Sequence, residues 1–182
     1  SSNGFGKTTA RPSSRNRSKQ RLQRNMTESI LLALADAEVE FVLIGGMAAV
    51  AQGVPYTTHD VDIVHRRTAK NIERLTEFLA KHDAIYRAQF GRRIMPTAAH
   101  LAGPGTALTQ TDLGQLDMLG TIADGRDYDA LIDHAISLEI EGRMIRVLSL
   151  SEIVAIKRLS THPKDQAQLP VLEATLARLA RD

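Results

Sequence analysis

The chain has no cysteine, and only 4% of its residues are aromatic. The absence of cysteine excludes a disulfide framework, a Cys-ligated zinc site and a thiol nucleophile. No run of about 18 apolar residues occurs, so no membrane-spanning helix is predicted. No apolar signal-peptide core follows the basic start, so a cytoplasmic protein is expected. The few aromatics leave little of the stacking surface with which proteins commonly bind single-stranded nucleic acid.

The 182 residues, of which 43% are hydrophobic and 24% charged, are typical of a soluble globular protein with about one domain. Seven of the 23 basic residues lie within residues 1–25, which contain no acidic residue, and the remainder has 16 basic against 21 acidic residues. Because this Ser-, Asn-, Gly- and Arg-rich segment cannot bury enough apolar surface, a disordered basic arm is predicted over 1–25. It could attract phosphate-rich partners or only solubilise the chain.

Hydrophobic periodicity predicts alternating helices and strands after this arm. The continuous apolar run Phe41–Ile44 is typical of a strand buried on both faces. Other strands are predicted at 61–64, 106–109, 115–119, 136–140 and 144–148. Helices are predicted at 27–36, 47–52, 68–82 and 128–135, and Thr27 is expected near the N-cap of the first. Two further helices are predicted, one from Ser149 or Ser151 and one from about Lys164, with Pro170 as a boundary or kink in the last. The segment 89–105 is expected to be a loop or short irregular strands. The pattern indicates an α+β or α/β core over 26–148, with C-terminal helices at 149–182 packed on it.

Two carboxylates alternate with apolar residues in Asp60-Val61-Asp62-Ile63. On a strand, positions i and i+2 project to one face about 6.5 Å apart along the chain. Asp60 and Asp62 therefore form a candidate cradle for Mg²⁺ or Mn²⁺, hard cations that take oxygen ligands and commonly bind together with phosphates. Such a site suits phosphoryl or nucleotidyl transfer. The alternative is the solvated face of an edge strand.

Gly45-Gly46 follows the first predicted strand and begins the next helix. Glycine lets a phosphate approach the backbone, and a helix start presents free N–H donors. A Gly-Gly pair alone is common in turns that connect a strand to a helix. Followed by Asp-x-Asp on the next strand, it indicates a nucleotide-binding site much more specifically.

The chain resembles the nucleotidyltransferase superfamily at these residues, and within it the AbiEii and Men-type toxin nucleotidyltransferases. The resemblance spans roughly residues 40–170 and implies a mixed sheet flanked by helices. The matching positions are Gly45-Gly46, Thr58, Asp60-Val61-Asp62, Lys157 and Lys164-Asp165. The chain departs from the family pattern at Tyr56, where many relatives carry an arginine. The phosphate contact of that arginine is therefore either missing here or supplied by another residue.

The superfamily often has a third carboxylate on a later strand. Asp117, between Leu116 and Met118, is the candidate, because an aspartate there is costly to bury unless it is paired or coordinated. Asp112, expected in a loop, is the competitor. His59 is expected to face away from both carboxylates and to be structural.

The resemblance implies that Gly45, Gly46 and Thr58 line the triphosphate. Lys157 would neutralise phosphate charge, with Asp165 orienting it; Lys164 ranks below Asp165 as a member of the site. The alternative is that these three are solvated helix charges, since an acidic residue in the first turn favours the helix dipole.

The sequence therefore predicts a metal-dependent enzyme that moves a nucleoside monophosphate from an NTP to an acceptor, with Asp60, Asp62 and Asp117 at the metal. By resemblance, the acceptor is the 3′ end of tRNA and the protein a toxin neutralised by a cognate antitoxin. Three alternatives stay open: modification of a protein or small-molecule hydroxyl, an inactive nucleotide-binding partner protein, and a nucleic-acid-binding module that acts through the arm. The sequence does not determine the oligomeric state.

Overall fold

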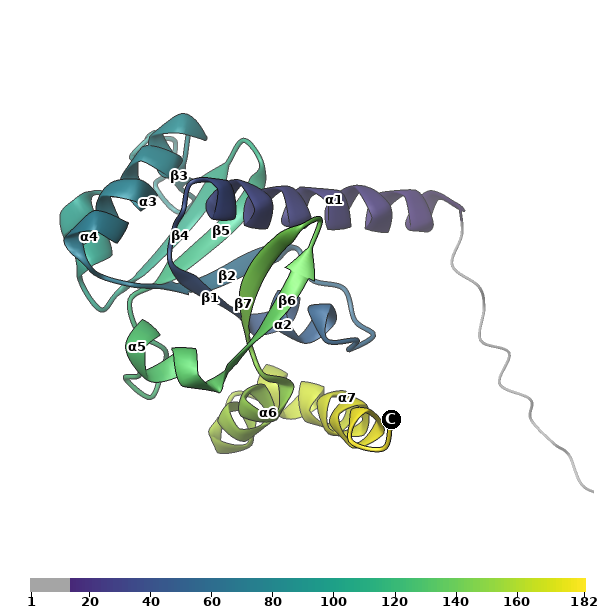
Figure 1. The fold of residues 1–182 in the computed structure, drawn as a ribbon. Helices are drawn as coiled ribbons and strands as arrows, with labels where there is room; N and C mark the ends of the chain where they lie inside the picture. Colours follow the sequence, from purple (N-terminus) through teal and green to yellow (C-terminus); the bar gives the residue numbers. More distant parts are fainter. Residues whose placement is uncertain (1–13) are drawn as a thin grey trace, which may run out of the picture.

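A mixed seven-stranded sheet forms the centre of the fold (Figure 1). The computed structural model describes residues 14–182. The strands are β1 (Phe41–Ile44), β2 (Asp60–His65), β3 (Ile85–Tyr86), β4 (Thr106–Thr111), β5 (Gly114–Leu119), β6 (Ala135–Ile140) and β7 (Arg143–Leu148). Their order across the sheet is β3-β4-β5-β2-β1-β7-β6. The β2–β5 and β1–β7 pairs are parallel, and the other pairs are antiparallel.

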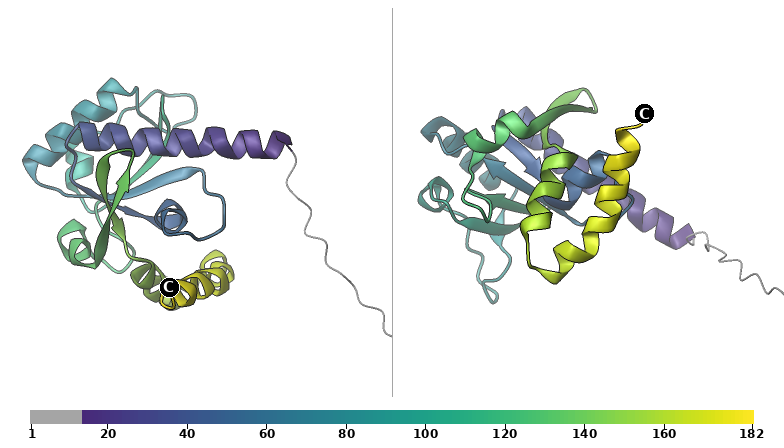
Figure 2. Two further views of the ribbon diagram at one scale, coloured as in Figure 1. Left: turned by 45° about the vertical axis from the view of Figure 1, so that its right-hand side comes forward. Right: turned by 90° about the horizontal axis from the view of Figure 1, so that it is seen from below.

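Helices connect and cover these strands. They are α1 (Ser14–Asp36), α2 (Gly45–Ala51), α3 (Ala69–Lys81), α4 (Ala98–Ala102), α5 (Tyr128–Leu131), a 3₁₀ turn η1 (Ile132–His134), α6 (Leu150–Leu159) and α7 (Pro163–Leu179). Helix α1 packs across β2, β5 and β7, while α6 packs on α2 and α7. Figure 2 shows α6 and α7 side by side at the end of the molecule away from α3 and α4. None of the helices in residues 14–182 is long and apolar enough to cross a membrane.

The central strands differ in how their two faces are buried. All four residues of β1 are buried, as the continuous apolar run predicted. On β2, Val61 and Ile63 are fully buried on one side, and Asp60 and Asp62 are half-buried on the other. Edge strand β6, by contrast, alternates between half-buried and exposed residues. The mixed α/β architecture predicted from the sequence is thereby confirmed.

Helix α1 extends further toward the N-terminus than predicted. It begins at Ser14, so residues 14–25, expected to be disordered, are helical, and Thr27 is a buried interior residue rather than an N-cap. Arg, Lys and Gln are good helix formers, and a helix that is already packed can extend through them one residue at a time. The prediction for residues 1–13 lies outside the described part of the chain.

One other local prediction was wrong, and one short strand was missed. The segment 89–105 contains α4, capped by the Thr97 hydroxyl, which accepts a hydrogen bond from the His100 N–H at 3.2 Å. Strand β3, only two residues long, was not predicted. Of the two alternatives predicted for Pro170, a boundary or a kink, the structure excludes the boundary, since α7 continues through it. Short elements of this kind depend on tertiary neighbours rather than on a local pattern.

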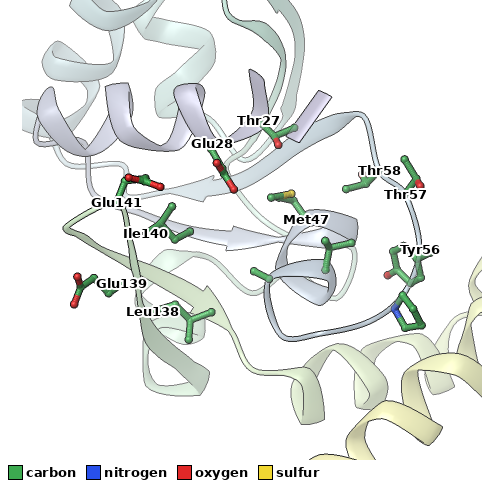
Figure 3. A pocket seen from close by; sticks show the side chains of 13 residues that line it. Thr27, Glu28, Met47, Tyr56, Thr57, Thr58, Leu138, Glu139, Ile140 and Glu141 are labelled. Atoms are coloured by element: carbon green, nitrogen blue, oxygen red, sulfur yellow. The ribbon is translucent and has the colours of Figure 1, made fainter. Parts of the chain in front are cut away.

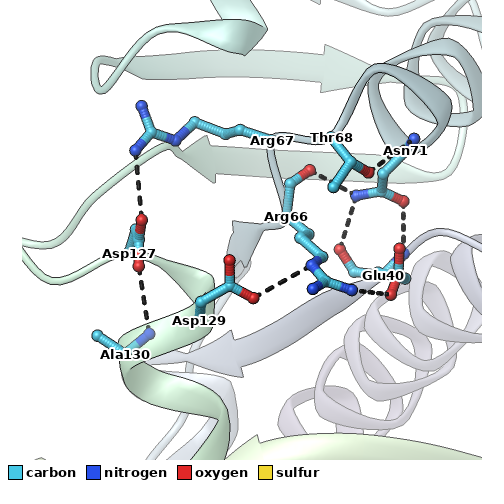
Figure 4. A network of polar contacts seen from close by, with 8 residues as sticks. All are labelled: Glu40, Arg66, Arg67, Thr68, Asn71, Asp127, Asp129 and Ala130. Atoms are coloured by element: carbon cyan, nitrogen blue, oxygen red, sulfur yellow. Dashed lines mark hydrogen bonds and ion pairs between the residues drawn. The ribbon is translucent and has the colours of Figure 1, made fainter.

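A polar network holds the end of β2 to the start of β1 and to α5 (Figure 4). The buried Asn71 side chain donates to the carbonyls of Glu40 and Arg66 at 2.9 and 2.7 Å and accepts from the Glu40 N–H at 2.7 Å. The Arg66 guanidinium pairs with Glu40 at 3.0 Å and with Asp129 at 3.1 Å. These contacts fix the antiparallel register of β1 and β2, on which the position of Asp62 depends.

We expect Gly120→Ala to destabilise the protein by about 2 kcal/mol or more, because overpacking a tight backbone contact has this cost. A Cβ at Gly120 would collide with the carbonyl oxygen of Gly103 and lie 2.9 Å from Pro104 Cα. Gly105→Ala is the matched control, since its Cβ would meet only the His100 Nε2 at 3.4 Å. Urea unfolding measures both, and equal stabilities would contradict the close approach.

Candidate functional site

Three aspartates meet on the polar face of the sheet. Asp62 lies opposite Ile44 on β1 and opposite Asp117 on the parallel neighbour β5. Residues opposite each other on neighbouring strands project to the same face, and Asp60 shares that face because it is two residues from Asp62. Asp117 is only 5% exposed. The structure thus brings together the three carboxylates predicted from the sequence.

Burial, together with the neighbouring carboxylates, makes Asp62 hard to ionise. The pKa of Asp62 is raised to about 6, first by burial and then by the negative charges of Asp117 and Asp60. The positive charges of Arg87 and Lys164 oppose this rise. A raised carboxylate pKa at a polar cluster is typical of sites that bind a cation or transfer protons.

Arg87, which sequence analysis missed, forms an ion pair with Asp117. Its Nη2 donates to Asp117 Oδ2 at 2.9 Å and its Nη1 donates to Gln115 Oε1 at 3.0 Å. Burial raises the pKa of Asp117, and the hydrogen bond and charge of Arg87 act against that rise. Arg87 directly follows β3, in a segment without periodicity, so no sequence signal marked it.

The competing carboxylate, Asp112, lies elsewhere. It stands in the turn between β4 and β5, where its Oδ1 pairs with His82 Nδ1 at 2.9 Å. The structure therefore favours Asp117 over Asp112 as the third carboxylate. His59 is exposed directly before β2.

Gly45 and Gly46 lie against two of the predicted site residues. Gly45 has φ +67°, and a Cβ there would lie 2.6 Å from Asp62 Oδ2. A Cβ on Gly46 would lie 2.9 Å from Thr58 Oγ1. Both positions therefore require glycine for the close approach of backbone to a side chain. The predicted nucleotide-binding residues Gly45, Gly46 and Thr58 are neighbours in space, next to Asp62.

Tyr56 packs on the same glycine. Its Cε2 lies 3.7 Å from the Cβ position of Gly46. Its hydroxyl is buried and has no hydrogen-bond partner among the described residues, and burial raises the pKa of the phenol. An aromatic ring thus lies where the resemblance to the superfamily implied an arginine.

The lysines predicted for the site occupy two different environments. Lys157 Nζ donates to Asp165 Oδ1 at 2.5 Å, and the Ser160 hydroxyl donates to Asp165 Oδ2 at 2.6 Å. These two contacts hold the pKa of Asp165 below its usual value. The expected pairing of Asp165 with Lys157 is therefore present. Lys164, ranked below Asp165 from the sequence, is the lysine whose charge acts on Asp62.

The three aspartates are the residues of this face that could bind a divalent cation. Within residues 14–182, no three acidic, histidine or cysteine side chains form a ready-made metal cluster. Asp117 Oδ1 is nevertheless buried without a hydrogen-bond partner, and Asp62 is crowded by negative charge. An unpaired buried oxygen beside like charges is stabilised by a cation. We therefore regard Asp60, Asp62 and Asp117 as fitting an oxygen-ligated divalent ion.

A cavity of about 680 Å³ borders this region (Figure 3). Its walls come from α1, α2, the segment 55–58 and the end of β6. Met47 and Leu138 contribute apolar surface, Thr58 joins the cavity to the glycine pair, and Glu139 and Glu141 are exposed at its edge. The volume suits a small ligand. The three aspartates are not among the lining residues.

A glycine pair that begins α2 directly after β1, two aspartates on the next strand and a third on its parallel neighbour define a nucleotidyltransferase fold. Two solved structures share it. A lincosamide antibiotic adenylyltransferase, LnuA, solved with lincomycin bound, is 16% identical, with 82% of this chain and 96% of that chain covered and a TM-score of 0.53. An antigenic nucleotidyltransferase-like protein from Paracoccidioides brasiliensis is 17% identical, with coverages of 88% and 77% and a TM-score of 0.53.

The family model described as aminoglycoside-2''-adenylyltransferase matches residues 27–169. The chain belongs to this family, within the nucleotidyltransferase superfamily. No curated protein matches it significantly by sequence. The superfamily predicted from the sequence is confirmed, whereas the toxin branch stays a prediction.

We expect Asp62→Asn to stabilise the metal-free protein above pH 6 by about 1 to 3 kcal/mol. Because the folded-state pKa of Asp62 exceeds its ordinary value of 3.8, the folded protein binds more protons than the unfolded chain between about pH 4 and 6. The free energy of unfolding therefore falls as pH rises through that window. Urea unfolding at pH 4.5 and 8 measures the difference; Asp133→Asn, on the 3₁₀ turn, is the control. An equal effect at both pH values would contradict the raised pKa of Asp62.

We expect Tyr56→Phe to leave the melting temperature unchanged or to raise it. The substitution removes a buried hydroxyl without a hydrogen-bond partner and keeps the ring against Gly46. Tyr86→Phe, which removes a hydroxyl bonded to His100 Nδ1, is the comparison. Thermal unfolding of both variants measures the effect, and a clear loss of stability in Tyr56→Phe would mean that the hydroxyl has a partner.

Proposed function

We propose that the protein is a divalent-cation-dependent nucleotidyltransferase that moves a nucleoside monophosphate, in the first instance AMP, from an NTP to a hydroxyl of a small-molecule acceptor. The observation that carries this proposal is the alignment of Asp62 with Asp117 on one sheet face, with Gly45 in contact with Asp62. The aminoglycoside-2''-adenylyltransferase family supports a small-molecule acceptor. The similarity to LnuA, whose structure contains bound lincomycin, supports the same class of acceptor.

In this proposal Asp60 and Asp62 hold the cation, and Asp117, beside them on the same face, serves the acceptor hydroxyl. When bound, the cation neutralises charge on the triphosphate and on the leaving pyrophosphate. Gly45 and Gly46 leave room for phosphate oxygens beside Thr58. Lys164 supplies positive charge toward Asp62, and Lys157 supplies a second positive group held by Asp165.

The chemical step uses the unpaired oxygen of Asp117. Oδ1 accepts the proton of the acceptor hydroxyl, whose oxygen then forms a bond to the α-phosphorus. The bond from that phosphorus to the β-phosphate bridging oxygen breaks, and pyrophosphate leaves. Arg87 keeps Oδ2 occupied throughout.

The sheet face beyond Asp117 is open to an acceptor. On β4, Leu108 lies opposite Asp117 and is 44% exposed, and Thr106 and Gln110, which share its face, are also exposed. A small molecule can therefore lie along β4, beside the buried Asp117. The same face supplies polar groups, such as Gln115, for a hydrogen-bonding acceptor.

Transfer to the 3′ end of tRNA, and inhibition by an antitoxin, remain the alternative acceptor and partner hypotheses. Their support is the sequence resemblance to the toxin branch together with the basic residues near the N-terminus. Transfer to a protein hydroxyl, or nucleotide binding without transfer, are further outcomes of the same experiment.

Incubation of the full chain with each α-³²P-labelled NTP and Mg²⁺, in parallel with aminoglycosides, lincomycin or total tRNA, tests the proposal. We expect label on a small molecule with stoichiometric pyrophosphate release, and loss of both in Asp60→Ala and Asp62→Ala. Asp133→Asn is the matched carboxylate control and should retain transfer. Chelation of the divalent ion should abolish the reaction.

The other outcomes are distinct. Label on tRNA would overturn the small-molecule acceptor and support the toxin hypothesis. Label on protein would identify a protein hydroxyl as the acceptor. Nucleotide binding without pyrophosphate release would support an inactive binding protein.

A further inference from the structure

The contacts of Arg87 divide the two oxygens of Asp117. Oδ2 accepts a hydrogen bond from Arg87 Nη2 at 2.9 Å, whereas Oδ1 is buried with no partner among the described residues. The Asp117 side chain is 8% exposed, so water has little access to it. Arg87 thus occupies one oxygen of Asp117, and the backbone of Thr109 also acts on this carboxyl to lower its pKa.

Arg87 is itself held in place from two sides. Its backbone N–H donates to the Leu108 carbonyl at 3.0 Å, which continues the pairing of β3 with β4 by one residue. At the other end, Nη1 donates to Gln115, two residues before Asp117 on β5. The side chain therefore reaches over β4 to β5, and its guanidinium contacts two side chains on the face that carries the aspartates.

A planar guanidinium suits this position better than an ammonium would. Its rigid fork donates to Gln115 and Asp117 at the same time, which defines the orientation of the carboxylate as well as its charge. An ammonium at the end of a flexible chain can satisfy the charge without defining the orientation. The positive charge also offsets part of the repulsion among the three aspartates, as its lowering effect on the pKa of Asp62 shows.

We propose that Arg87 is a positioning residue for nucleotidyl transfer: by binding Asp117 Oδ2 and Gln115, it presents Oδ1 to the acceptor hydroxyl. This inference rests on the proposed function. It assigns to Arg87 no contact with the NTP, so that its loss should slow the transfer step rather than weaken nucleotide binding.

Arg87→Gln, Arg87→Lys and Arg92→Gln, compared in the transfer assay with the NTP and acceptor that the wild type uses, test this role. Arg92 is an exposed arginine in the loop that follows β3, so its substitution removes one positive charge from the same loop. We expect Arg87→Gln to lower kcat at least tenfold with the KM for NTP within threefold of the wild type. Arg87→Lys should be intermediate, and Arg92→Gln should be within twofold of the wild type.

Circular dichroism and thermal unfolding verify that each variant is folded. If Arg87→Gln does not fold, Arg87→Lys, which keeps the charge, decides the question: a reduced kcat with an unchanged KM supports positioning. An effect confined to the KM for NTP would mean that Arg87 binds phosphate, and would overturn the inference.

Equal activity of Arg87→Gln and Arg92→Gln would also overturn it. A wild type without transfer activity overturns the proposed function and this inference together, whereas an active wild type with an unaffected Arg87→Gln overturns this inference alone.

Discussion

Repulsion between Asp62 and Asp117 is the constraint on which the site depends. The parallel register of β2 and β5 places the two residues opposite each other, with Asp60 two residues away on the same face. Buried like charges are unfavourable unless cations or hydrogen bonds compensate them. Arg87 compensates Asp117 directly, Lys164 acts on Asp62, and the remaining excess of negative charge is what makes the face suited to a divalent cation.

The rest of the fold keeps these groups from moving apart. Strand β1 is buried on both faces, so its pairing with β2 cannot slip without exposing apolar residues. Asn71 and Arg66 hold the far end of that pair, where no catalytic group lies. The scaffold therefore supplies the stability that the site lacks, as is common where function requires an unfavourable local arrangement.

The sequence predicted those site residues whose role depends on a pattern of a few consecutive residues. The buried run before Gly45, the alternation of Asp60 and Asp62, and the apolar neighbours of Asp117 each carry their structural meaning in a few consecutive residues. Arg87 could not be found in this way. Its position depends on a two-residue strand and on Gln115, and both contacts join segments far apart in sequence. The extent of α1 likewise depended on packing that composition does not show.

The different environments of the two lysines bear on which one binds phosphate. Lys157 is 16% exposed and already paired with Asp165, so a phosphate would have to compete with a carboxylate that also holds Ser160. That pair joins the end of α6 to the first turn of α7, where Lys164 precedes Asp165. Lys157 and Asp165 therefore hold this corner, while the charge of Lys164 acts on Asp62 and opposes the rise of its pKa. The ranking of Asp165 above Lys164 stays a prediction, since the sequence motif does not show which of two neighbouring residues in the first turn of α7 contacts a bound nucleotide.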